Sequence, residues 1–174
     1  MIQNVKFVAY VNGVFSNVGL EPQEVCLVKM STGSSCIITF DTTNLNYTWL
    51  DRLYNKQNSH QTHKIPFPFK GKMTQEDGRK LSKKLYQEKD EGKNLLMAVL
   101  GLKQREFFQS CGLNTVDIWN DLKLDLKFNE LSDYPTPFVK CHKEQVHLVG
   151  LDYNCSRRKA YKIMQYLKKI KVPN

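Results

Sequence analysis

The 174-residue sequence lacks several features that would assign it to particular classes of protein. Its longest apolar run, residues 95–100, is far shorter than the roughly 20 residues that a membrane-spanning helix requires. The start, residues 1–4, lacks the basic segment followed by an apolar stretch that marks a secretory signal. It has no internal repeat, low-complexity tract or Gly/Ser linker. We therefore expect one soluble intracellular domain over residues 1–174, with no membrane partner.

Cysteine is scarce and odd in number, which argues against the disulfide framework of a small secreted protein. Of the five cysteines, Cys26, Cys36 and Cys111 lie in apolar runs, and we expect them to be buried thiols that pack as small hydrophobic residues. Cys141 and Cys155 have two histidines nearby and suggest a different role.

Acidic residues are fewer than basic ones, 17 against 26, which gives a formal net charge of +9. Hydrophobic residues make up 41% of the chain, too many for a disordered protein. A basic excess of this size favours a polyanionic partner, above all nucleic acid. The alternative is that the charge only keeps a small protein soluble.

The first quarter of the chain predicts three strands joined by short links. β-Branched and aromatic residues fill residues 5–11, 24–31 and 36–40. Asn12-Gly13 either forms a tight hairpin turn or opens a loop that runs to Pro22. Three such strands predict an antiparallel meander.

The rest of the chain predicts alternating helices and strands. We expect irregular structure over 41–73 because of Pro66 and Pro68, and a helix that begins after Thr74 and ends at Gly92. Further segments are a strand buried on both faces (95–100), a helix (103–111), a strand (114–118), a helix (119–128), an irregular stretch (133–154) and a final helix (156–171). This order predicts an α/β fold, a mixed sheet flanked by helices with ribonuclease H-like architecture.

One stretch near the C-terminus combines residue types that bind metal. Cys141, His142, His147 and Cys155 lie within 15 residues, and thiolate and imidazole are the preferred ligands of structural zinc. Glu24 is a candidate for a further ligand, because carboxylates also bind zinc. The alternative is a pair of buried thiols with two surface histidines.

Several motifs resemble the Maelstrom domain, a ribonuclease H-like module of the piRNA pathway. Residues 22–29 are similar to the Pro-x-Glu-Ile strand of that family, and residues 63–66 (His-Lys-Ile-Pro) to its Ser-His-Lys-Ile-Pro stretch. The interval from His147 to Cys155 has the spacing of the family's C-terminal His and Cys. The HMG box that usually precedes this module is absent from the sequence.

The resemblance implies one structural zinc ion per chain, held by Glu24, Cys141, His147 and Cys155. The gap between the first cysteine and the histidine is five residues here and two in vertebrate relatives. His142 is therefore a rival to His147 as the ligand.

The Maelstrom module is in turn similar to DEDDh exonucleases, which hold two metal ions with clustered carboxylates. The first strand should carry Asp-x-Glu, but residues 7–12 contain no acid. Asn154 and Lys159 stand where the last helix should carry His and Asp. Asp117 and Glu106 remain, and we expect them to be capping or exposed acids. We therefore expect no catalytic residues for two-metal chemistry.

Basic residues indicate where nucleic acid would bind. Arg157, Arg158, Lys159 and Lys162 begin the final helix, and Lys70 and Lys72 lie near Phe67 and Phe69. Cations that contact phosphates and rings that stack on bases suit a single strand. The alternative is a solvated cationic face, with both phenylalanines as core anchors of the loop. We expect Trp49 and Trp119 to lie in the core.

These observations predict a catalytically degenerate, nuclease-like domain that binds single-stranded RNA in small-RNA or transposon silencing. Its expected location is the cytoplasm, in perinuclear granules, or the nucleus. Two alternatives remain: a scaffold that binds proteins of the silencing machinery, and a residual endonuclease that cuts single-stranded RNA without metal.

Overall fold

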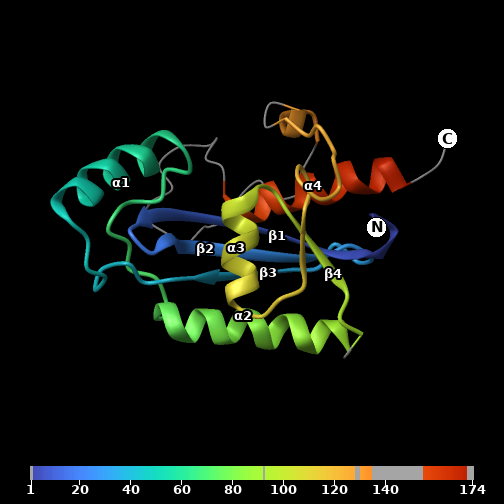
Figure 1. Ribbon diagram of the computed structural model, residues 1–174, viewed down its shortest axis with the longest axis horizontal. Coiled ribbons are helices and arrows are strands. Elements are labelled where there is room, and N and C mark those ends of the chain that lie inside the picture. Colours follow the sequence, from blue (N-terminus) through green and yellow to red (C-terminus); the bar gives the residue numbers. More distant parts are fainter. Residues whose placement is uncertain (1, 92, 128–129, 135–154, 172–174) are drawn as a thin grey trace.

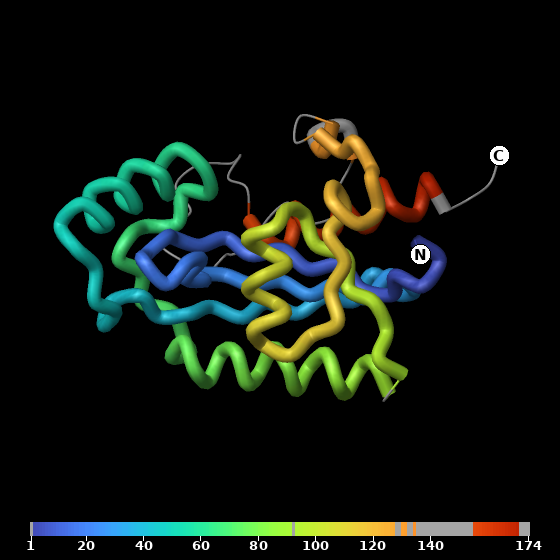
Figure 2. The backbone as a smooth tube through the Cα atoms, viewed as in Figure 1, coloured from blue at the N-terminus to red at the C-terminus, as the bar shows by residue number. Residues whose placement is uncertain are grey.

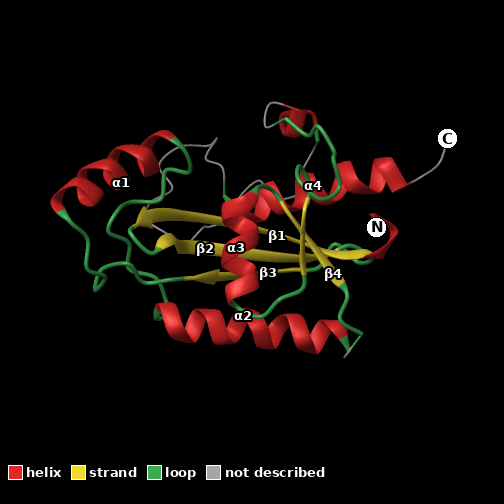
Figure 3. Ribbon diagram, in the orientation of Figure 1, coloured by secondary structure: helices red, strands yellow, loops and turns green. Residues whose placement is uncertain are grey.

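The computed structural model describes residues 2–91, 93–127, 130–134 and 155–171 (Figures 1 and 3). The strands are β1 (Val5–Ser16), β2 (Gly19–Lys29), β3 (Ser35–Thr39), β4 (Leu96–Val99) and β5 (Thr115–Asp117). The α-helices are α1 (Trp49–Gln61), α2 (Gln75–Asp90), α3 (Leu102–Ser110) and α4 (Ser156–Lys171), and short 3-10 helices cover Ile2–Asn4 and Glu130–Asp133. None of the helices in these ranges is long and apolar enough to span a bilayer.

The strands form one mixed sheet in the order β3-β2-β1-β4-β5. The first three pair antiparallel, whereas β4 runs parallel to both of its neighbours, β1 and β5. This arrangement confirms the predicted meander followed by parallel strands. It also explains the apolar run at 95–100, because a strand between two parallel neighbours is covered by side chains on both faces.

Alternate residues of the strands supply two hydrophobic layers, one on each face of the sheet. On one face, Tyr10, Cys26 and Val28 pack with Ala160, Ile163, Met164 and Leu167 of α4. On the other face, Phe7, Val25 and Leu27 pack with Tyr86 of α2 and with Phe107 and Phe108 of α3. Figure 2 shows α2 and α4 on opposite sides of the sheet. The first strand and the last helix are therefore direct neighbours.

The β1–β2 hairpin is longer than the sequence predicted. Asn12-Gly13 forms neither a turn nor the start of a loop, because β1 continues to Ser16 and the register shifts between these two residues. A side chain at Gly13 would clash with the backbone carbonyl of Glu21. The glycine here permits close approach of two strands at a bulge, which explains why it resembles a turn signal.

The prediction of irregular structure over 41–73 is wrong for residues 49–61, which form α1. Thr48 and Asp51 make a reciprocal capping box at its start. The helix attaches to β1 through polar groups: Asn55 donates to the carbonyl of Phe15 (2.6 Å) and accepts from its N–H (2.8 Å). Because the attached face is polar, the helix has no inward apolar stripe for a sequence pattern to detect.

The predicted helix over 119–128 is also wrong. Residues 118–121 form a turn, and Lys123 adopts a left-handed conformation that ends helical winding (φ 54°). Leu126 is buried against the α4 layer. Neither tryptophan is in the core, since Trp49 is 73% exposed and Trp119 is 37% exposed.

Candidate functional site

The first strand and the last helix meet at Lys159. Its Nζ donates to Oδ1 of Asn12 (3.2 Å) and to the hydroxyl of Tyr10 (3.3 Å), and it lies 4.6 Å from the centre of the Tyr10 ring. Tyr10 and Asn12 are two residues apart on β1, so they share one face of the strand. The cluster thus combines a cation, a phenol and an amide, and none of its three members is a carboxylate.

Burial dominates the electrostatics of this cluster. It lowers the pKa of Lys159 to about 8, an effect that nearby Cys155 and Glu24 partly offset. Burial also raises the pKa of Tyr10 to about 12, and a hydrogen bond with Gln104 opposes that shift. Near neutral pH Lys159 therefore remains largely protonated and the phenol of Tyr10 uncharged, so the cluster itself holds one positive charge, beside the carboxyl group of Glu24.

Two of the four predicted zinc ligands lie beside the cluster. Glu24, on β2, accepts hydrogen bonds at Oε1 from the N–H and the hydroxyl of Ser156, both at 2.7 Å. The Sγ of Cys155 accepts from the N–H of Arg158 (3.3 Å), as an N-cap side chain does. Both Glu24 and Cys155 are 1% exposed. The fold thus brings the second strand and the start of α4 together, as a shared ion would require.

The other two predicted ligands, Cys141 and His147, lie outside the described residues, as do the rival His142 and the polar Asn154. Within the described ranges, no group of three or more His, Cys, Asp or Glu side chains could hold a metal ion. The described half of the donor set fits zinc chemically, because it is a buried carboxylate beside a buried thiol.

The two acids that remained as candidates for nuclease chemistry have structural roles. Asp117, fully buried on β5, accepts from the backbone N–H groups of Gly101 (2.9 Å) and Trp119 (3.0 Å) and from the amide of Asn120 (2.5 Å). Glu106 is exposed and pairs with Lys103 at 3.1 Å. Their interpretation as capping and surface acids is confirmed by these bonds.

The predicted nucleic-acid contacts fall into two groups. Arg157, Arg158 and Lys162 are half-buried on the first two turns of α4, and the Nε of Arg157 donates to the hydroxyl of Ser35 at 2.8 Å. Lys70 and Lys72 are exposed in the segment before α2, where Lys70 pairs with Asp41. The Phe67 ring is half-buried and packs edge-on against Tyr47 at 4.9 Å.

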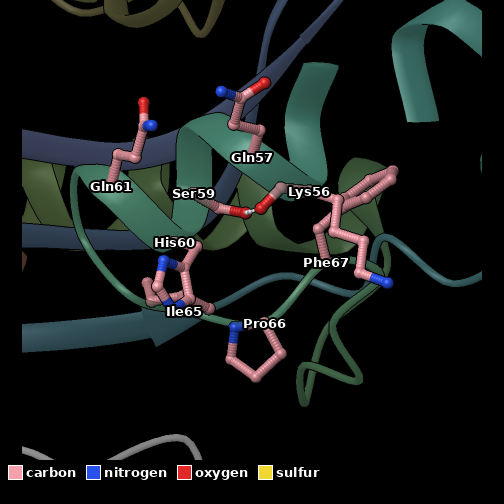
Figure 4. A pocket seen from close by; sticks show the side chains of 8 residues that line it. All are labelled: Lys56, Gln57, Ser59, His60, Gln61, Ile65, Pro66 and Phe67. Atoms are coloured by element: carbon pink, nitrogen blue, oxygen red, sulfur yellow. Dashed lines mark hydrogen bonds between the residues drawn. The ribbon is translucent and has the colours of Figure 1, made fainter. Parts of the chain in front are cut away.

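Sequence reasoning missed a pocket of about 380 Å³ beside α1. It lies between the second half of the helix and residues 65–67, and Figure 4 shows its lining: Lys56, Gln57, Ser59, His60, Gln61, Ile65, Pro66 and Phe67. His63 anchors this loop, since its Nε2 is 3.0 Å from the carbonyl of Gly13 and its Nδ1 accepts from the N–H of Ile65. The capping pattern Thr48-x-x-Asp51, which Thr74 and Asp77 repeat at the start of α2, could have revealed the helix α1.

The fold resembles that of a solved viral exonuclease domain. This chain is similar to the solved exonuclease domain of Mopeia virus, with a TM-score of 0.55 and 14% sequence identity. The match covers 98% of this chain and 80% of the viral chain. This likeness confirms the ribonuclease H-like, mixed-sheet fold class.

No protein-family model matches the sequence. No curated protein matches it either. The similarity to the viral domain therefore supports only the assignment of the fold. Any binding or catalytic activity has to be inferred from the side chains of this chain.

Proposed function

We propose that this chain is an RNA-binding domain with a degenerate exonuclease fold, stabilised by one structural zinc ion. The observation that carries the proposal is the Lys159 ammonium group, bonded to Asn12 and Tyr10. Two-metal nucleases need clustered carboxylates at this kind of site to hold divalent cations. A buried ammonium group there opposes metal binding and attracts phosphate.

The start of α4 supports binding to a single strand. Arg157, Arg158 and Lys162 follow one another on the first two turns, next to the Lys159 cluster. Arginine and lysine bind the phosphate backbone without reading sequence. Tyr10 and Asn12 add a ring and an amide that suit contacts with an unpaired nucleotide. Lys70 and Lys72, on the segment before α2, are proposed as a second group of phosphate contacts.

Zinc is proposed at Glu24 and Cys155, with Cys141 and His147 as the remaining ligands. The burial of both side chains, and the hydrogen bonds from Ser156, the neighbour of Cys155, to Glu24, support this assignment. When bound, zinc would hold the second strand to the entry of α4 and so support the RNA-binding helix. The motifs shared with the Maelstrom domain further favour a role in small-RNA silencing, in cytoplasmic granules or the nucleus.

Filter binding of a 20-nucleotide single-stranded RNA, over a range of salt concentrations, tests the proposal. The variant Arg158→Gln/Lys162→Gln should bind at least tenfold more weakly than the wild type. If both side chains contact phosphates, the slope of log affinity against log salt should fall by about 1.4. The matched control is Lys83→Gln/Lys84→Gln, which removes the same charge from exposed residues of α2 on the opposite face of the sheet.

The two variants separate a site from a general charge effect. Equal weakening by both would mean that only net charge attracts RNA. No binding by the wild type at low salt would refute the proposal, and chelator-sensitive trimming of RNA from one end would contradict the assigned loss of two-metal chemistry.

A further inference from the structure

The helix α1 is amphipathic in the opposite sense from an ordinary surface helix. Its inward face is polar, with Asn55 and Ser59 buried and hydrogen-bonded. Its outward face carries Trp49 (73% exposed), Leu50, Leu53 (54% exposed) and Tyr54. Four of the eight large hydrophobic residues that are exposed in the described parts of the chain therefore lie on this one helix. Such a concentration marks an interaction surface.

We propose that the outward face of α1 is a docking surface for an apolar, acidic segment of a partner protein. We call this face the α1 surface and define it by Trp49, Leu50, Leu53 and Tyr54. The inference goes beyond RNA binding, because α1 lies at the hairpin end of β1 and β2, and none of these four residues belongs to the Lys159 cluster (Figure 1).

The pocket beside α1 favours a peptide as the occupant. Lys56 and His60 line the pocket and follow Trp49 and Leu53 along the same side of the helix, at helical spacing. A cavity of about 380 Å³, closed on its other side by Ile65, Pro66 and Phe67, therefore lies further along the side of the helix that carries Trp49 and Leu53. Protein interfaces concentrate their binding energy in one or a few anchor side chains that fill such pockets.

Charge favours an acidic segment. Arg52 and Lys56 are exposed on α1, and among the described residues neither forms an ion pair. These two cations beside an apolar patch complement carboxylates that flank the apolar anchors of a partner. The net charge of +9 opposes occupation by a second copy of this chain. RNA is a less suitable occupant, because nucleobases stack on flat aromatic rings, whereas Leu50 and Leu53 present branched aliphatic groups.

Selection from a displayed library of random 16-residue peptides tests the surface directly. The wild type is compared with Trp49→Gln/Leu53→Gln, which replaces two exposed side chains and leaves the buried face of α1 unchanged. The matched control is Val18→Gln/Leu102→Gln, which removes two exposed apolar side chains elsewhere. Circular dichroism and thermal unfolding verify that all three proteins are folded.

We expect the wild type and the control to enrich the same peptides, in which large apolar residues alternate with Glu or Asp. The synthetic peptides should bind Trp49→Gln/Leu53→Gln at least tenfold more weakly, and Arg52→Glu/Lys56→Glu should also weaken them. In a Trp119→Phe background Trp49 is the single tryptophan, and its emission should shift to shorter wavelength on binding.

Four outcomes would overturn the proposal: no enrichment, enriched peptides without acidic residues, equal binding by the Trp49→Gln/Leu53→Gln variant, and occupation by another partner. Two measurements test for another occupant. If a second copy occupies the surface, sedimentation equilibrium will show a wild-type dimer that this variant abolishes. If RNA occupies it, filter binding will show that this variant weakens RNA binding. Since the variant should retain the RNA affinity of the wild type, the failure of this inference is distinguishable from failure of the proposed function.

Discussion

The Nζ of Lys159 lies 3.2 Å from Oδ1 of Asn12, across 147 residues of sequence. This hydrogen bond joins the last helix to the first strand, where the Lys159 ammonium group also lies over the Tyr10 ring. A positively charged group therefore lies between these two elements, on the side of the sheet that α4 covers. The proposed absence of two-metal chemistry and the proposed attraction of phosphate both rest on this positive charge.

Replacing Lys159 by Met should change how stability depends on pH. Burial depresses the pKa of Lys159 from 10.5 to about 8, so the unfolded chain binds the proton more tightly than the folded one. Below pH 8 the folded state bears the full cost of burying the ammonium group, and the cost disappears as pH rises toward 10.5. The wild type should gain at most about 3 kcal/mol relative to Lys159→Met over this range.

Urea unfolding at several pH values between 7 and 10.5 measures this difference. Lys168→Met, at an exposed position of the same helix, serves as the control and should follow the wild-type profile. Parallel profiles for the wild type and Lys159→Met would show that the ammonium group is solvated in the folded protein.

Cys155→Ser should abolish zinc binding. We expect the purified wild type to contain about one zinc ion per chain by metal analysis. Loss of a ligand should remove the ion and lower the free energy of unfolding by several kcal/mol, because metal binding and folding are coupled in such sites. Glu24→Gln should weaken zinc binding as well, and its lost charge also weakens the bonds from Ser156.

Cys36→Ser, at a half-buried position on β3, is the matched control and should retain the ion. A wild type that refolds fully in the presence of a strong chelator would argue against the zinc site. So would one zinc per chain in the Cys155→Ser variant.

Gly78→Ala should destabilise the protein, although alanine normally favours a helix over glycine. Gly78 is buried on α2, and an added Cβ would lie only 2.6 Å from Cδ1 of the Phe40 ring. The ring is fully buried and cannot move freely, so we expect a loss of about 1–3 kcal/mol. Replacing the ring by a smaller side chain should relieve the clash. Gly78→Ala should therefore cost less stability in a Phe40→Leu background than in the wild type.

Thermal unfolding of the single and double variants completes this cycle. Gln87→Ala, at an exposed position of α2, is expected to stay within about 0.5 kcal/mol of the wild type. Additive effects of the changes at residues 40 and 78 would mean that the two positions do not contact each other.

Asp117→Ala should cost stability without affecting RNA. The carboxylate satisfies the N–H groups of Gly101 and Trp119, and its loss leaves buried donors unpaired at a cost of about 2–4 kcal/mol. Chemical denaturation measures the cost, and filter binding at a temperature where the variant is folded measures the RNA affinity. Asp125→Ala, at an exposed position, should change neither quantity. A selective loss of RNA or metal binding by Asp117→Ala would instead assign the residue to a functional site.

The sequence alone determined the elements that carry a strong periodic pattern. The apolar strands β1 to β4 and the helices α2 and α4 were predicted because each buries an apolar face, and burial imposes a spacing that can be read without coordinates. The absence of acids over residues 7–12 and the lysine at 159 were equally visible. From these came the expectation of a nuclease-like fold without two-metal chemistry.

Tertiary structure alone decided the features whose partners are far apart in the chain. The helix α1 escaped prediction because its buried face is polar and bonds the backbone of Phe15, so its exposed Trp49 resembled a core residue. The segment after β5 failed as a helix because Asp117 holds the turn and Lys123 ends the winding. The meeting of Lys159 with Asn12, and of Glu24 with Ser156, depends on α4 packing against the first two strands. No local pattern encodes these contacts, because packing and long-range hydrogen bonds rather than residue propensity select them.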